Sequence, residues 1–118
     1  MKRLILILII FATVLFLGVS SYLYTKDTAQ IMSDYCTKIL AGDYAQTKKM
    51  SAFYESRQKI LSLYTYKERI NNISRVINRA NYLLAENKYE ELKLCTIEIS
   101  KMINIIYADE KLTYENIF

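Results

Sequence analysis

The segment Lys2–Tyr24, KRLILILIIFATVLFLGVSSYLY, decides the fold because it is a long apolar N-terminal run, whereas the rest of the chain is more polar. The uncharged run from Leu4 through Tyr24 is 21 residues long. A transmembrane helix needs about 20 consecutive residues that are mostly apolar. A helix also pairs its backbone amide and carbonyl groups within the segment, as the lipid interior requires. The sequence therefore predicts that residues 4–24 anchor the chain in a membrane.

A cleaved signal peptide is the alternative interpretation of this segment. Gly18 and Ser20 are small residues at the spacing that a signal peptidase reads. However, the apolar run is at the upper limit of length for a signal peptide. Tyr22 and Tyr24 also resemble aromatic anchors at a membrane interface. We therefore favour an anchor that is not cleaved.

The charges that flank the apolar run predict its orientation. Lys2 and Arg3 precede the run, whereas Lys26 and Asp27 cancel each other after it. Positively charged flanks stay on the cytoplasmic side of a membrane. We expect a single-pass protein of the cell membrane, with a cytoplasmic stub and anchor in residues 1–24 and an exported domain in residues 25–118.

The exported domain has a composition typical of long helices. The chain has no Pro and only two Gly, so it is poor in residues that form turns. Apolar residues recur with helical period in four stretches, at 27–41, 43–64, 65–84 and 87–106. The second and third stretches also fit one long, kinked helix. The predicted fold class is all-α: an N-terminal transmembrane helix followed by a small antiparallel bundle of two helical hairpins.

Three short sequences resemble helix starts. Asp43, Thr65 and Asn87 are each followed three residues later by Gln or Glu, which is the capping-box pattern. These residues are expected to accept hydrogen bonds from free amide groups at the starts of the second, third and fourth helices. Gly42 is expected to end the first helix.

Cys36 and Cys95 are the only cysteines, and an exported location permits a disulfide. Each lies seven or eight residues from a predicted turn at one end of the bundle, so both stand about 10 to 12 Å from that end. If the first and last helices are neighbours, the two thiols could form a disulfide. The alternative is two buried free thiols.

A basic stretch in the middle of the chain is a candidate anion-binding face for lipid headgroups or wall polymers. Its residues are Arg57, Lys59, Arg69, Arg75 and Arg79. The alternative, which we favour, is that these cations face the acidic last helix or solvent. Net charge is +4, but two of the 16 basic residues precede the span, which leaves 14 basic and 12 acidic residues beyond it. That balance and the exported location argue against nucleic-acid binding.

The sequence has few of the residues and motifs that catalysis needs. The chain has no His, which removes the commonest general acid–base and a frequent metal ligand. It also lacks a Gly-rich phosphate loop and a convincing nucleophile–base pair. We expect no enzyme activity, no cofactor and no metal site.

The last nine residues, EKLTYENIF, end on two large apolar side chains. We expect the chain to leave the last helix beyond Ile106 and fold back. Leu112, Ile117 and Phe118 then either pack on the bundle or form a contact with a partner.

The layout as a whole resembles a family of small bacterial membrane-anchored proteins catalogued as domain of unknown function 4363. The resemblance rests on the short basic start and single span, on the Gly42–Tyr44 turn and on the tail Glu110–Phe118. It implies a single-span anchor with a helical exported domain and carries over no catalytic or binding residues. Such proteins are often encoded beside a multi-spanning membrane protein, which implies a membrane partner.

Two functions follow as hypotheses. The first is a non-enzymatic interaction or accessory subunit for a membrane-protein partner. The second is an exported binding module for wall polymer, peptide or anionic lipid headgroups. The surroundings of the five basic residues distinguish them, because a binding groove needs cations that are not already paired.

Overall fold

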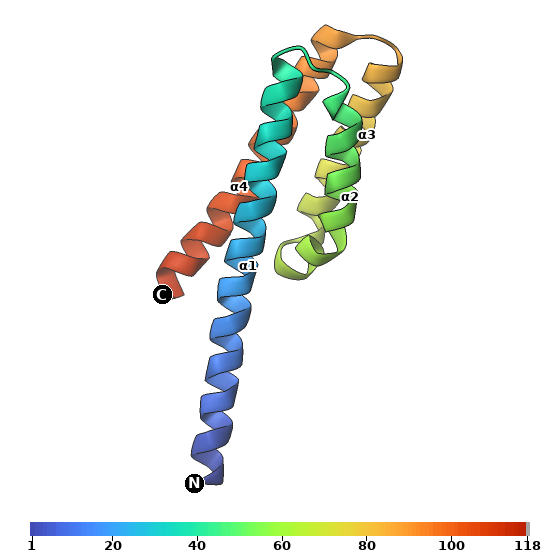
Figure 1. The fold of residues 1–118 in the computed structure, drawn as a ribbon. Coiled ribbons are helices and arrows are strands. Elements are labelled where there is room, and N and C mark those ends of the chain that lie inside the picture. The colour runs from blue at the N-terminus through green and yellow to red at the C-terminus, as the bar shows by residue number, and fades with distance from the viewer. Residues whose placement is uncertain (118) are drawn as a thin grey trace.

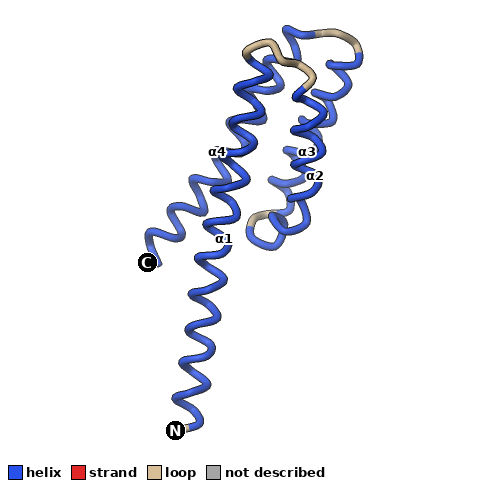
Figure 2. Tube along the Cα trace, viewed as in Figure 1, coloured by secondary structure: helices blue, strands red, loops and turns tan. Residues whose placement is uncertain are grey.

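The computed structural model describes residues 1–117, and side chains through residue 116. Within that range the chain forms four helices (Figure 1), and the segments between them are short loops (Figure 2). They are α1 (Lys2–Leu40), α2 (Gln46–Tyr64), α3 (Lys67–Ala85) and α4 (Tyr89–Ile117). The predicted all-α fold class is confirmed. The second and third helices are separate, because Thr65 and Tyr66 adopt extended backbone conformations between them.

Helix α1 is the largest difference from expectation. We expected a helix to begin near Asp27, but α1 runs without interruption from Lys2 to Leu40. The reason is that the apolar run and the amphipathic stretch after it both favour helix, and no Pro separates them. At 1.5 Å per residue its 39 residues span about 58 Å. Its N-terminal half projects beyond the bundle (Figure 1), and it is the one described helix long and apolar enough to cross a membrane.

The four helices form an antiparallel bundle in which α1 and α3 run one way and α2 and α4 the other (Figure 1). Helix α1 packs against α2 and α4, and α3 packs against the same two neighbours. The N-terminus of α1 and the end of α4 therefore point to the same end of the bundle. We call this end, which lies beside residues 17–24 of α1, the anchor end.

The bundle core is built from buried apolar side chains that all four helices contribute. Tyr54 of α2 is the largest fully buried side chain, and its hydroxyl donates a 2.7 Å hydrogen bond to the Ile70 carbonyl of α3. This bond satisfies the polar end of a buried ring. The other fully buried large apolar residues are Met32, Ile39, Met50, Leu61, Ile70, Ile73, Leu92 and Ile99.

The predicted capping boxes are wrong, because the residues concerned end helices or lie in turns. Among the described residues, α2 and α3 start without a side-chain cap, and Asp43 only accepts a 3.0 Å hydrogen bond from the Gln46 side chain. Gly42, at φ 108°, ends α1 as expected, and Asn87, at φ 57°, ends α3 in the same way. In each turn the next amide donates to the carbonyl five residues back, which is the Schellman motif.

The tail does not fold back as expected, because α4 continues to Ile117. No Pro or Gly follows Asn87, and the last turns of α4 contact α1. Ser21 donates a 2.8 Å hydrogen bond to Glu110, and the rings of Tyr22 and Tyr114 stack with centroids 4.4 Å apart. Leu112 is 58% exposed. The side chain of Ile117 and all of Phe118 lie outside the described residues.

Candidate functional site

The outer face of α4 carries a row of exposed apolar side chains. Leu94, Ile97, Ile105 and Leu112 are 66%, 40%, 53% and 58% exposed. At 100° per residue all four fall within about 80° of one another around the helix axis, together with Lys101 and Ala108. We call these six residues the α4 stripe. Burial of the opposite face of α4 leaves this second apolar face without a cover in the described chain.

A shallow cavity of about 160 Å³ lies beside the middle of the stripe, between α3 and α4. Ile105, Met102 and Ile73 supply its apolar lining, and Arg69 and Asn72 its polar lining. A second, larger hollow of about 430 Å³ follows along the same helix pair, and its charged lining is Arg75, Arg79 and Glu98. A protein surface of this kind, apolar in the middle with basic groups beside it, is typical of a protein–protein contact.

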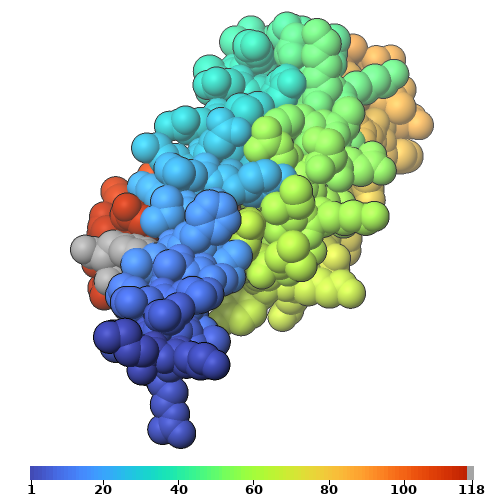
Figure 3. Space-filling view, turned by 60° about the horizontal axis from the view of Figure 1, so that its bottom comes forward, coloured from blue at the N-terminus to red at the C-terminus, as the bar shows by residue number. Residues whose placement is uncertain are grey.

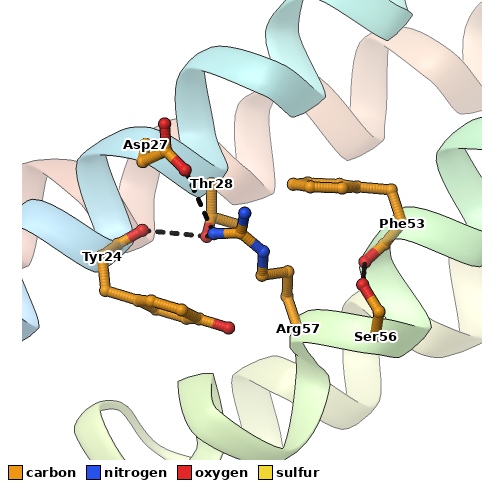
Figure 4. A network of polar contacts seen from close by, with 6 residues as sticks. All are labelled: Tyr24, Asp27, Thr28, Phe53, Ser56 and Arg57. Atoms are coloured by element: carbon orange, nitrogen blue, oxygen red, sulfur yellow. Dashed lines mark hydrogen bonds and ion pairs between the residues drawn. The ribbon is translucent and has the colours of Figure 1, made fainter.

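The candidate anion-binding residues do not gather on one face. Arg57 points toward α1, where its guanidinium lies between the rings of Tyr24 and Phe53, at 5.0 and 4.8 Å from their centroids (Figure 4). It also donates hydrogen bonds to Asp27 at 3.1 Å and to Thr28 at 3.3 Å. Stacking and ion pairing together make this arginine a link between α1 and α2.

The remaining basic residues lie on α2 and α3. Arg69 pairs with Asp109 of α4, and Arg79 lies 3.9 Å from Glu98 of the same helix. Arg75 donates to the side chain of Asn72 within α3, and Lys59 is exposed on α2. The expected alternative, pairing with the acidic last helix, therefore applies to Arg69 and Arg79.

Cys36 and Cys95 are both buried free thiols in the structure, which is the alternative to the disulfide considered from the sequence. Cys36 faces α2, with its sulfur 3.9 Å from that of Met50, whereas Cys95 faces α3, where the Arg79 Nε donates to its sulfur at 3.2 Å. Their helices are neighbours, but the two sulfurs contact side chains of α2 and α3 and not each other. Burial raises the pKa of the Cys36 thiol to about 11, so it stays protonated and unreactive at neutral pH.

Aromatic side chains gather at the anchor end. Tyr22 stacks on Tyr114 and lies 6.1 Å from the Tyr107 ring, and Tyr24 contacts Tyr64 edge to face at 6.2 Å. These contacts join α1 to α4 and to the end of α2. Clusters of Tyr are typical of a membrane–water interface, where one end of the ring is apolar and the other is hydrated.

A cleft of about 510 Å³ opens between these helices at the anchor end. Leu17, Gly18 and Ser21 form its wall on α1, and Leu63 and Tyr64 its wall on α2. The last turns of α4 close the third side with Glu110, Thr113 and Tyr114. The cleft therefore combines residues of the predicted membrane span with residues of the bundle.

Sequence reasoning named Leu112 as a contact residue but missed the rest of the α4 stripe. The available signal was that apolar residues cover two faces of α4, since Leu94, Ile97 and Ile105 do not belong to the set that packs inward. Comparisons of this chain with protein families, curated proteins and solved structures found no match.

Proposed function

We propose that this protein is a non-enzymatic subunit, held in the cell membrane by α1, whose α4 stripe binds a membrane-protein partner outside the cytoplasm. One observation carries the proposal: four large apolar side chains of the stripe are exposed along a helix whose other face is fully packed. Exposed apolar rows of this length on a solvent-facing helix are typical of surfaces that contact another protein.

The direction of the stripe supports a partner that is itself in the membrane. Helix α4 runs back along α1 toward the anchor end, so the stripe follows the direction of the proposed span. Leu112 lies in the last turns of α4, which are beside residues 17–22 of α1, and Leu94 lies near the start of α4. A partner helix that rises from the same membrane would therefore lie parallel to the whole row. Lys2 and Arg3 at the start of α1 support a cytoplasmic N-terminus.

Charge favours a different protein over a second copy of this chain. Lys101 lies in the middle of the stripe, with Ile97 and Ile105 on either side. Two copies anchored in one membrane would pack their α4 helices in parallel about a two-fold axis, which brings Lys101 opposite Lys101. Like charges at the centre of a contact oppose association. A partner helix with an acidic residue at that level fits the stripe better.

The alternative function, an exported binding module for wall polymer, peptide or anionic headgroups, has less support. It needs cations that are available to a ligand, and three of the five candidate residues face carboxylates on α1 or α4. Those three are Arg57, Arg69 and Arg79.

Charge introduced into the stripe tests the proposed function. We expect Leu94→Glu and Ile105→Glu each to release the chain from a larger complex in mildly solubilised native membranes. A buried, unpaired carboxylate costs several kcal/mol at an interface, which corresponds to an affinity loss of about a hundredfold or more. The measurement is the native mass of the complex, with the partner identified by mass spectrometry.

Asn78→Glu, an exposed position on α3, is the matched control and should leave the complex unchanged. Far-UV circular dichroism should be the same for all variants, since every substituted side chain is exposed. Wild-type protein that migrates alone, or only with copies of itself, would contradict the proposal. Retention of the complex by both stripe variants would contradict it as well.

A further inference from the structure

The α2–α3 turn carries the two most exposed large apolar side chains that the structure describes beyond residue 40. Leu63 is 78% exposed and Tyr66 is 73% exposed. Tyr64 lies between them and turns toward α1. Burial of apolar surface is favourable, so a leucine and a tyrosine that face solvent contribute little to stability unless something apolar covers them. We call Leu63, Tyr64 and Tyr66 the tip.

The tip is level with the outer part of the predicted membrane span. The Tyr64 ring lies 6.2 Å from that of Tyr24, the last residue of the span. Leu63 shares the anchor-end cleft with Leu17 and Gly18, which lie further into the apolar run. In Figure 3 the start of α1 comes forward at this end, and the α2–α3 turn and the end of α4 lie on either side of it.

The length of the span shows how deep in the membrane the residues beside the tip lie. If the hydrocarbon begins at Leu4, about 20 residues bring α1 to its outer boundary near Leu23. At 1.5 Å per residue, Leu17 and Gly18 then lie about 8 to 9 Å inside that boundary. Because Leu63 lines the same cleft as these two residues, and Tyr64 lies beside Tyr24, the turn stands close to the outer boundary of the hydrocarbon. From this geometry we propose that the tip is inserted in the lipid leaflet next to the bundle, with Leu63 among the acyl chains.

The chemistry of the anchor end favours lipid as the occupant. The cleft beside the tip is lined mainly by apolar and aromatic groups, and its one carboxylate, Glu110, accepts a hydrogen bond from Ser21. The charges that follow the tip have both signs, as in Lys67 and Glu68, and Arg69 pairs with Asp109. Insertion therefore depends on apolar burial and interfacial tyrosines, and zwitterionic phosphatidylcholine is sufficient.

The test uses tryptophan fluorescence, which is clean here because the chain has no Trp. Full-length Leu63→Trp protein is reconstituted in phosphatidylcholine bilayers that contain lipid brominated on its acyl chains. Tyr82→Trp is the control, because Tyr82 is also exposed, at 59%, but lies on α3 near the opposite end of the bundle. We expect quenching of Leu63→Trp to exceed that of Tyr82→Trp by about threefold or more, with a blue-shifted emission, as suits a ring below the headgroups.

The inference rests on the proposed membrane anchor, and a third variant separates the two claims. Val14 lies in the middle of the apolar run, so the tryptophan fluorescence of Val14→Trp should be strongly quenched. Absence of quenching there contradicts the anchor itself. Quenching of Val14→Trp without quenching of Leu63→Trp overturns the insertion of the tip alone. Quenching of Leu63→Trp only after anionic lipid is added overturns it too, since that result points to binding by charge.

Discussion

Replacing Ile10 and Val14 of α1 together by arginine should release the protein from the membrane. Each arginine near the centre of a span costs about 3 kcal/mol, and the pair also loses two apolar contributions, for a total of about 7 kcal/mol. That sum is comparable with the entire favourable transfer energy of a run of this length. Both residues lie in the projecting part of α1 and contact no other helix, so the bundle itself should not change.

Extraction of membranes with alkaline carbonate measures this effect. We expect wild-type protein in the pellet and the double-arginine variant in the supernatant, with bundle helicity preserved by circular dichroism. The matched control places the same two charges on the bundle, as Gln30→Arg with Asn78→Arg, both at exposed positions. That control should stay in the pellet. A double-arginine variant that also resists extraction would show that α1 is not the anchor.

Replacing Ile103 by alanine should cost about 2 to 4 kcal/mol of unfolding free energy, whereas the same change at Ile105 should cost less than about 0.5 kcal/mol. The two residues are two positions apart on α4, but Ile103 is 3% exposed and Ile105 is 53% exposed. The first substitution leaves a cavity between four helices. The second removes a side chain that faces solvent in the isolated chain.

Denaturant unfolding of the full chain in detergent micelles, followed by circular dichroism, gives both values. The pair is a strict test because the residue type, the helix and the substitution are identical. Equal losses at the two positions would mean that α4 packs with a different rotation from the one described here, and the stripe would then not be a surface.

The helices themselves were predictable from the sequence because several independent signals agree on them. The scarcity of Pro and Gly and the recurring apolar spacing both favour long antiparallel helices, and Gly42 marks the first turn correctly. The continuity of α1 was not predicted. A change in composition near Asp27 looked like a boundary, but both sides of it favour helix and neither Pro nor Gly stands there to interrupt the backbone hydrogen bonds.

The rotation of each helix about its axis was harder to predict than its length. Rise per residue gave Cys36 and Cys95 similar heights, yet their sulfurs contact α2 and α3 and do not face each other. The same limit hid the α4 stripe. With apolar residues on two faces of α4, periodicity alone does not say which face is inside, and only packing against α1 and α3 decides it.

The central claim is that the α4 stripe contacts a membrane-protein partner, and site-specific photo-cross-linking in native membranes tests it most directly. A photoreactive amino acid is placed singly at successive exposed positions of α4 from Glu91 to Leu112. We predict cross-links to one membrane protein at Leu94, Ile97, Ile105 and Leu112, with little product at exposed positions off the stripe, such as Glu91 and Lys111. Cross-links without helical periodicity, or to lipid or copies of this chain alone, would contradict the account.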